Sequence, residues 1–423
     1  MKARYRGKPV RRATLPGTDI AGTGMTGRIL VLRWTGSAHD FTGGMLELAA
    51  RELAADGHDV LLFVAKDGED WPARLVETLN QGGIAFALTM SGIGADLTLG
   101  GDSLWARARV PLFNWNCDHP GYFPARHAIR DPYVLHGYVF PDHARAAMAH
   151  LNPNGMAFAA HMGIPPRALF AGAPLAERNG RLLFTKNGHD PNAIEARWRR
   201  YGPDLSTLLL TAAEDLFHRA TADFLPVLRA LGEQHGLFLD GGNQLMLQLI
   251  RELDGYIRFR RAALVVESLL RHPVDVFGTG WEHVAREGGA RDGARARFHG
   301  PLPWRATLER LPRYTGSLSI HPLIEESVHD RVFFALAAGV TPIGDANAFT
   351  RARMPALEPY TFTFHPDRVV QAADAVLSRP AEALARTEDT WRAMAEPFGL
   401  RQSLRRIARF ARTPTVLNAS YRV

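Results

Sequence analysis

The sequence predicts an α/β protein with two Rossmann-like domains, each a parallel sheet covered by helices, followed by C-terminal helices. Short apolar runs typical of buried strands alternate with longer segments of helical periodicity, which is the pattern of βαβ units. A Pro- and Gly-rich segment at residues 163–180 interrupts this alternation, as interdomain linkers do. The length of 423 residues also exceeds what one core usually supports.

The first βαβ unit is expected at residues 28–65. Both "RILVLRW" (28–34) and "VLLFVA" (60–65) have the continuous apolar character of buried strands. A helix is expected between them, because four apolar residues recur at helical spacing: Met45, Leu48, Ala49 and Leu53. Gly57 follows the last of these and is expected to end the helix. Two strands joined by one helix predict parallel pairing.

Further strands are expected in both halves of the chain. In the first half they are "GIAFALTM", "VPLFNWN" and "YVLHGYVF". In the second half they are "RLLFTKNG", "VDVFGTGW", "ARFHGPLPW", "GSLSIHP" and "VTPIGD". A helical stretch at about 190–271 separates the first of these from the others.

Four regions follow from this pattern. Residues 1–27 are predicted to be a disordered basic arm, because they lack periodicity. Residues 28–178 are expected to form the first domain, and residues 179–385 the second domain with its helical insertion. Residues 386–423 are expected to form helices that pack back on the first domain.

Composition predicts a globular, cytoplasmic, bacterial protein. Hydrophobic residues make up 46% and charged residues 22% of the chain, and no apolar run reaches the roughly 18 residues of a membrane span. The basic N-terminus lacks the apolar stretch of a signal peptide. Cys117, the single cysteine, excludes an internal disulfide and fits a reducing compartment.

The formal net charge of +7 leaves two interpretations open. Much of the excess lies in residues 1–12 and in "LRQSLRRIARFAR" (400–412), which has the pattern of a basic amphipathic helix. Such a helix either packs on its own protein or makes peripheral contact with an anionic membrane surface, here the inner membrane face. No zinc-finger spacing or RNA-binding signature occurs, so no nucleic-acid partner is expected.

A group of charged residues precedes the expected helix in "HPLIEESVHDRVFFALAAGV" (321–340). Ser327 and Asp330 fit a Ser-x-x-acid capping box, so they are predicted to cap the helix. Capping does not require Glu325, Glu326 or Arg331. Helix N-termini that follow parallel strands bind phosphate groups through free N–H groups, and an arginine one turn into the helix adds charge. The segment therefore predicts an anion site.

Several segments together resemble the nucleotide-sugar-binding half of GT-B glycosyltransferases, in the bacterial group-1 and spore-maturation-type branch. They are "KNGHDP" (186–191), "FGTGW" (277–281), "FHGPLPW" (298–304) and "SIHPLIEESVHDRVFFALAAGVTPIGD" (319–345). "TGGMLELAARELAADGHDVLLF" resembles the beginning of the acceptor domain of that fold. The resemblance implies a GT-B-like arrangement, in which the parallel sheets of two Rossmann-like domains face a central cleft.

The resemblance also implies donor-binding residues. Gly278, Gly280 and Trp281, with the loop of His299 and Gly300, would line the base and ribose. Glu325, Glu326 and Ser327 would face the sugar and diphosphate, and Arg331 and Lys186 would neutralise the phosphates. The chain departs from the pattern at one position: many members carry a second Glu, separated from the first by seven residues, that holds the ribose, and this chain has Phe334 there.

Purely structural roles are open for the same residues. Gly278 and Gly280 would then only shape a tight turn, and Arg331 would only pair with a neighbour such as Asp330. Glu325 and Glu326 would be solvated loop residues. Gly43 and Gly44 either let the backbone approach donor phosphates or form a plain helix entry.

Two loops in the first half hold candidates for a general base. His119 beside Asp118 is the first choice, and His39 beside Asp40 is the second, because a carboxylate neighbour raises the basicity of an imidazole. Cys117 is interpreted as a small buried hydrophobe rather than a nucleophile. Six side chains invite a metal: His39, Asp118, His119, His136, Asp142 and His143. They lack the spacing of known metal motifs, so no metal is expected.

We therefore expect a glycosyltransferase that needs no cofactor or metal. Its donor would be a UDP-, GDP- or dTDP-linked sugar, and its acceptor a hydroxyl of a glycan, lipid or protein. The alternatives are an epimerase or hydrolase acting on a nucleotide sugar, and a catalytically silent binding module. A dinucleotide dehydrogenase is not expected, because no Gly-x-Gly-x-x-Gly follows the first strand.

Overall fold

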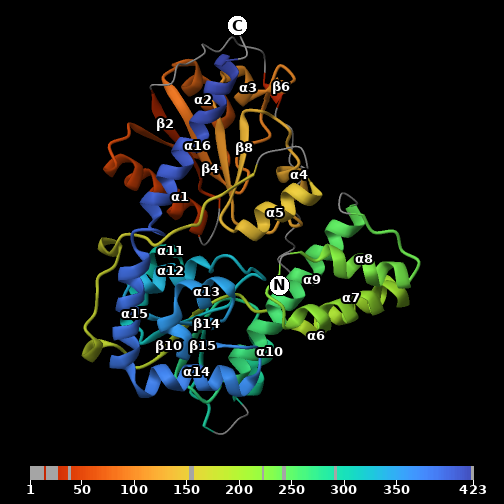
Figure 1. The fold of residues 1–423 in the computed structure, drawn as a ribbon, viewed down its shortest axis with the longest axis vertical. Coiled ribbons are helices and arrows are strands. Elements are labelled where there is room, and N and C mark those ends of the chain that lie inside the picture. The colour runs from red at the N-terminus through yellow and green to blue at the C-terminus, as the bar shows by residue number, and fades with distance from the viewer. Residues whose placement is uncertain are drawn as a thin grey trace.

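The computed structural model of the chain describes residues 14–15, 27–36, 40–151, 157–221, 223–240, 244–289 and 293–420. The predicted disordered arm lies outside the described residues, apart from Gly27 and the two-residue strand β1 (Thr14–Leu15), which pairs with β5 (Thr98–Leu99). The described chain forms two domains, one above the other in Figure 1, with a group of helices beside them.

The first domain is built on a six-stranded parallel sheet in the order β3-β2-β4-β7-β8-β9. Its strands are β2 (Arg28–Trp34), β3 (Val60–Ala65), β4 (Ile84–Met90), β7 (Leu112–Asn116), β8 (Val134–Tyr138) and β9 (Ala157–Ala159). Its helices are α1 (Phe41–Ala55), α2 (Trp71–Asn80), α3 (Leu104–Ala108), α4 (Pro124–His127) and α5 (Pro141–His150). β6 (Asp102–Ser103) pairs antiparallel with β5 outside this sheet.

Alternate residues of β2 show that both faces of this sheet are covered. Ile29 and Val31 belong to one buried apolar cluster, while Leu30 and Leu32 belong to another on the opposite face. The continuous apolar run of this strand is therefore explained by burial on both sides, as expected for a parallel sheet.

The second domain has a six-stranded parallel sheet in the order β12-β11-β10-β13-β14-β15. Its strands are β10 (Leu182–Thr185), β11 (Val274–Phe277), β12 (Arg297–His299), β13 (Gly316–Ser319), β14 (Thr341–Asp345) and β15 (Thr361–Phe362). Its helices are α10 (Glu282–Gly289), α11 (Trp304–Arg310), α12 (Asp330–Ala337), α13 (Ala348–Arg353), α14 (Pro366–Ser378) and α15 (Pro380–Met394). The strand order reverses between β10 and β13, and open α/β sheets bind ligands beyond the carboxyl ends of strands at such a point.

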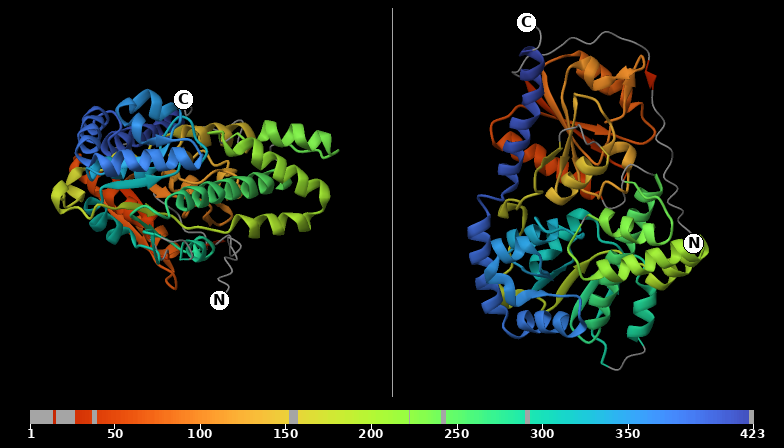
Figure 2. Two further views of the ribbon diagram at one scale, coloured as in Figure 1. Left: turned by 90° about the horizontal axis from the view of Figure 1, so that it is seen from below. Right: turned by 45° about the vertical axis from the view of Figure 1, so that its right-hand side comes forward.

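The expected helical stretch after β10 forms a separate group of helices. These are α6 (Pro191–Trp198), α7 (Pro203–Phe217), α8 (Leu225–Gln234) and α9 (Gln244–Ser268). Figure 2 shows them lying beside one another and projecting from the second domain. We call α6 to α9 the helical insertion.

The last helix, α16 (Leu400–Ser420), returns to the first domain and packs along α1. Leu404, Ile407 and Ala411 are buried, while Arg401 bonds to Glu52 and Arg405 to Asp56. These arginines therefore stabilise contact with the protein itself. No helix in the described part of the chain has both the length and the apolar character that crossing a membrane requires.

Candidate functional site

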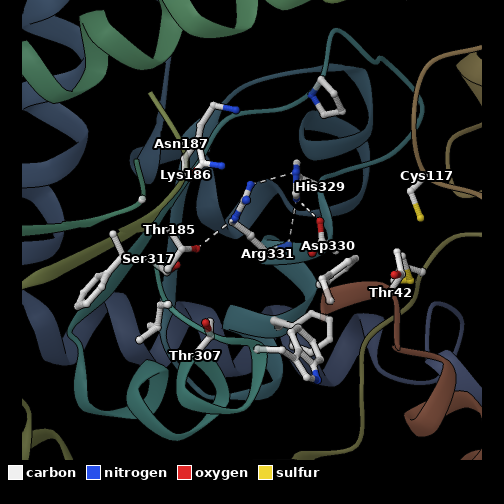
Figure 3. A pocket seen from close by; sticks show the side chains of 18 of the residues that line it. Thr42, Cys117, Thr185, Lys186, Asn187, Thr307, Ser317, His329, Asp330 and Arg331 are labelled. Atoms are coloured by element: carbon white, nitrogen blue, oxygen red, sulfur yellow. Dashed lines mark hydrogen bonds and ion pairs between the residues drawn. The ribbon is translucent and has the colours of Figure 1, made fainter. Parts of the chain in front are cut away.

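A cavity of about 380 Å³ lies between the two domains. The second domain contributes the residues that follow β10 and the first turn of α12. The first domain contributes residues that follow β7 and the first turn of α1. The polar lining residues are Thr42, Ser91, Cys117, Asp118, His143, Thr185, Lys186, Asn187, Arg258, Thr307, Ser317, His329, Asp330 and Arg331, many of which are labelled in Figure 3. The site therefore lies at the carboxyl ends of strands from both sheets.

Arg331, one of the predicted phosphate ligands, points into the middle of this cavity (Figure 3). Its Nε donates to Thr185 Oγ1 at 3.2 Å, and one guanidinium nitrogen lies 3.0 Å from His329 Nε2. Because an arginine can only donate, His329 Nε2 is the acceptor of this bond. The other ring nitrogen, Nδ1, faces both the backbone N–H of Arg331, at 3.4 Å, and the carboxylate of Asp330. Burial lowers the pKa of His329 to about 4, which agrees with a neutral ring. His329 thus holds Arg331 without neutralising it.

The predicted capping box at this helix is wrong. Helix α12 begins at Asp330, and His329 rather than Ser327 occupies the N-cap position. The Ser327 hydroxyl bonds instead to His161 Nδ1 at 2.8 Å, across the domain interface. Contact with the first domain therefore holds this serine two residues ahead of the helix cap.

The turn of Glu325 and Glu326 also makes interdomain contacts. The Asp142 carboxylate of α5 accepts both of their backbone N–H groups at 3.1 Å. The carboxylate of Glu326 accepts from Arg145 at 2.6 Å, and that of Glu325 from the backbone N–H of Ala348 at 2.8 Å. Neither glutamate nor Ser327 lines the cavity.

Lys186, the other predicted phosphate ligand, lines the cavity from the end of β10. Burial lowers its pKa well below the ordinary value, and the positive charges of Arg258 and Arg331 lower it further. Within the described part of the chain, no carboxylate lies within ion-pair distance of its ammonium group. An anionic ligand would supply the missing opposite charge.

Arg258 is a third cation at this cavity, and the sequence analysis did not identify it. It lies on α9 of the helical insertion, where Asp254 and Arg258 are four residues apart on a helix with many buried apolar residues. Its Nη1 lies 3.1 Å from Asp254 Oδ2. A charged pair among buried apolar positions is the signal that could have revealed it.

The predicted glycine turn holds the segment after β10 in place. At Gly278, a Cβ would lie 2.3 Å from the backbone oxygen of Lys186, and at Gly280, 2.1 Å from that of Gly188. Trp281 Nε1 donates to the Lys186 backbone oxygen at 2.7 Å. Of Gly278, Gly280 and Trp281, only Gly278 lines the cavity. The turn thus brings Lys186 to the site.

The loop after β12 lines the cavity with residues that directly follow the predicted pair, His299 and Gly300. His299 stacks on Phe277 with ring centroids 4.4 Å apart, and its Nε2 lies 3.5 Å from Asp275. Neither His299 nor Gly300 lines the cavity, whereas Pro301 and Leu302 do.

Of the predicted base candidates, Asp118 lines the cavity. Burial raises the pKa of this carboxyl group, which makes it a stronger base than an exposed aspartate. His119 lies behind it: it is buried, its Nδ1 accepts the Gly121 N–H at 3.1 Å, and its ring meets that of His143 edge to face. His143 lines the cavity, which the sequence analysis considered only as a metal ligand.

The other candidates of the first domain lie elsewhere. Asp40 is bonded to Arg33, is not among the residues lining the cavity, and His39 lies outside the described residues. Cys117 lines the cavity, where burial and the charge of Asp118 raise the pKa of its thiol. A protonated thiol is a poor nucleophile, which agrees with the interpretation of Cys117 as a small hydrophobe.

Aromatic rings form one wall of the cavity at the position where a glutamate was expected. Phe334 meets Trp304 edge to face at 5.0 Å, and Trp304 meets Phe41 of α1 in the same way at 5.1 Å. A Cβ at Gly44 would lie 2.2 Å from Trp304, so this glycine allows the indole to pack on α1. The wall offers apolar contact and no carboxylate.

The described residues include no group of three or more His, Cys, Asp or Glu side chains placed to hold a metal ion. Two of the six side chains considered as ligands have other partners: His136 Nε2 bonds to the Ile129 carbonyl at 2.9 Å, and Asp142 binds the backbone of the Glu325 turn.

Comparison with known proteins identifies the fold. No family model matches the chain, and no curated protein sequence matches it significantly. Among solved structures, sucrose-phosphate synthase from Thermosynechococcus elongatus has 10% identity and a TM-score of 0.54, over 93% of this chain and 100% of its own. An alpha-glucosyltransferase in complex with UDP and a 13-mer DNA has 9% identity and a TM-score of 0.54, over 91% and 99%.

Anabaena HepE in complex with UDP-glucose has 11% identity and a TM-score of 0.50, over 90% of this chain and 98% of its own. All three matches span both domains of this chain, because each covers at least nine tenths of it. The two parallel sheets, the cavity between them and these matches together establish that the chain has the GT-B fold of glycosyltransferases.

Proposed function

We propose that this protein is a glycosyltransferase that moves a sugar from a nucleoside-diphosphate sugar to a hydroxyl acceptor. The observation that carries the proposal is the group of three basic side chains, Lys186, Arg258 and Arg331, in the interdomain cavity of a GT-B fold. Two solved structures of this fold contain UDP or UDP-glucose, which supports a nucleotide-linked donor. A UDP-, GDP- or dTDP-linked sugar fits the proposal.

Electrostatic stabilisation of the leaving diphosphate is the main contribution proposed for these residues. As the bond between the sugar and the diphosphate breaks, negative charge grows on the phosphate oxygens. Lys186, Arg258 and Arg331 are already in place to stabilise that charge, and the N-termini of α1 and α12 add partial positive charge. Because the three side chains supply the positive charge, we propose that transfer requires no metal ion or cofactor.

Asp118 is proposed as the group that accepts the proton of the acceptor hydroxyl. It lines the cavity from the first domain, and burial raises its pKa although the nearby charge of Arg258 opposes this effect. His143 lines the same cavity, and its ring meets that of His119, the residue that follows Asp118. The acceptor is proposed to be a hydroxyl of a glycan, lipid or protein that enters from the side of the first domain.

Incubation with UDP-, GDP- and dTDP-sugars, with a chelator present, tests this proposal. The expected result is release of nucleoside diphosphate that becomes faster when hydroxyl acceptors are added and is abolished in Arg331→Ala. Turnover that is independent of every acceptor would identify a hydrolase or epimerase. Binding of a donor with no turnover, under any condition, would identify a silent binding module and contradict the proposal.

A further inference from the structure

The helical insertion contacts both the anion site and the loop that carries Asp118. Helix α9 places Arg258 in the cavity, although the rest of the insertion lies outside it. The same helix packs on the loop 117–123 after β7 of the first domain. There, a Cβ at Gly121 would lie 3.2 Å from Ile250 and 3.4 Å from the Leu247 carbonyl oxygen. A second contact comes from Phe224, before α8, whose ring meets that of His119 edge to face at 5.6 Å.

A chain of hydrogen bonds joins the loop 117–123 to Arg258 in the cavity. The Tyr122 hydroxyl donates to Asp254 Oδ2 at 2.6 Å, and Arg258 Nη1 donates to the same oxygen at 3.1 Å. Asp254 is 2% exposed, so neither bond competes with bulk water.

The charges in this chain are well defined. Burial raises the pKa of Asp254, but the charge of Arg258, the neighbouring His119 and the bond from Tyr122 outweigh burial and lower it. Burial lowers the pKa of Arg258, and the charge of Asp254 more than restores it. Asp254 is therefore an anion and Arg258 a cation, and a carboxylate between two donors fixes the positions of both.

We propose that Arg258 binds the diphosphate of the ligand and that Asp254 and Tyr122 are positioning residues linking it to the loop of Asp118. This inference rests on the proposed function. A bound phosphate attracts Arg258, and Asp254 and Tyr122 carry the resulting constraint to the loop 117–123 of the other domain. The diphosphate thus orders the loop that carries the proposed base, and the helical insertion is the connection.

Two variants separate binding from positioning, with UDP, GDP and dTDP as probes. Arg258→Ala is expected to weaken binding of the nucleotide by at least about tenfold, because a charge-assisted contact is lost. If that variant does not fold, Arg258→Gln replaces it. Tyr122→Phe removes one hydroxyl and leaves Arg258 in the cavity, so its affinity is expected to stay within about threefold of wild type.

Hydrogen exchange at saturating nucleotide measures the positioning role. In the wild type, the nucleotide is expected to slow amide exchange in the loop 117–123 and around residues 329–331. In Tyr122→Phe, the nucleotide is expected to slow exchange around residues 329–331 but no longer in the loop 117–123. Tyr314→Phe is the matched control, since it loses a 2.9 Å bond to Asp275 away from this chain of residues and should behave as wild type.

Different results would overturn the two proposals separately. If one nucleotide binds and the loop 117–123 is equally protected in Tyr122→Phe and wild type, the linking role is wrong and the proposed function stands. If Arg258→Ala and Arg258→Gln bind the nucleotide as tightly as wild type does, the role of Arg258 in this inference is wrong and the proposed function again stands. If none of the three nucleotides binds the wild type, the proposed function fails and the inference fails with it.

Discussion

Lys186 illustrates how single residues of this site serve a ligand at a cost to the free protein. Its ammonium group is buried beside two arginines, Arg258 and Arg331, and within the described part of the chain it has no ion-pair partner. Burial and the charges of these arginines favour the neutral amine of Lys186 in the free protein. A bound diphosphate would favour the charged form instead, so the site is arranged for the bound state.

This arrangement predicts that ligand binding takes up a proton at Lys186. Burial and the two arginines lower its pKa in the free protein, and a bound diphosphate raises it. Affinity is therefore highest below the free-state pKa and falls as the pH rises through the bound-state pKa. Calorimetry of UDP binding in buffers with different ionisation enthalpies measures the proton uptake.

Lys186→Met is the matching variant, because it keeps the length of the side chain and removes the charge. Its binding of UDP is expected to be weaker and to show no proton uptake assigned to this group. Equal uptake in wild type and variant would show that Lys186 is already charged in the free protein.

Sequence patterns revealed some of these residues and not others, for a physical reason. Arg331 was predicted from its place at the start of a helix that follows a parallel strand, and Lys186 from the resemblance of its segment to GT-B glycosyltransferases. Both residues follow the carboxyl end of a strand, where local position brings a side chain to the ligand edge of a sheet. Arg258 reaches the same cavity only because α9 folds back across the domains. The local sequence of α9 does not predict which part of the protein this helix packs against.

At the scale of elements, the turn after β11 supports the segment that carries Lys186. Gly280 has φ of 80°, and a Cβ there would lie 2.1 Å from the backbone oxygen of Gly188. Gly202 has a similar φ of 94°, but a Cβ there would meet nothing within 4 Å. The two glycines both have a positive φ, and they differ in the close contact that a Cβ would make.

Gly280→Ala is therefore expected to destabilise the folded protein more than Gly202→Ala does. The strain of positive φ costs about 1 kcal/mol in each variant, and the backbone collision at Gly280 adds roughly 1–3 kcal/mol. The melting temperatures of both variants measure the difference. Gly280→Ala should also weaken UDP binding, since Lys186 shifts with the segment. Equal melting temperatures would mean that the segment 186–188 moves away at no cost.

The elements also show where local sequence signals are dependable. The predicted strands are confirmed. The longest of them, β2 and β4, are apolar runs, as buried parallel strands require. The start of α12 was predicted incorrectly at Ser327. A capping signal is local, whereas here the serine bonds to His161 and the preceding backbone bonds to Asp142, both in the first domain.

At the scale of the whole molecule, the domains are joined by two chain crossings and by an interface of both polar and aromatic contacts. The crossings run side by side, since the Ile164 N–H donates to the Phe398 oxygen at 2.7 Å and the Leu400 N–H to the Ile164 oxygen at 2.9 Å. The interface places Asp142 against the Glu325 turn and Tyr122 against Asp254. These contacts hold the cavity residues of both domains next to one another.

The central claim is that the interdomain cavity binds a nucleoside diphosphate through its cations. The most direct test is calorimetric titration of UDP, GDP and dTDP into wild type, Arg331→Ala and Arg401→Ala. Arg401 is the control, because it pairs with Glu52 on α1 and does not line the cavity. We predict that at least one nucleotide binds, that Arg331→Ala weakens it by about tenfold or more, and that Arg401→Ala has no effect. No binding of any nucleotide to wild type, or equal affinity in the two variants, would contradict the account.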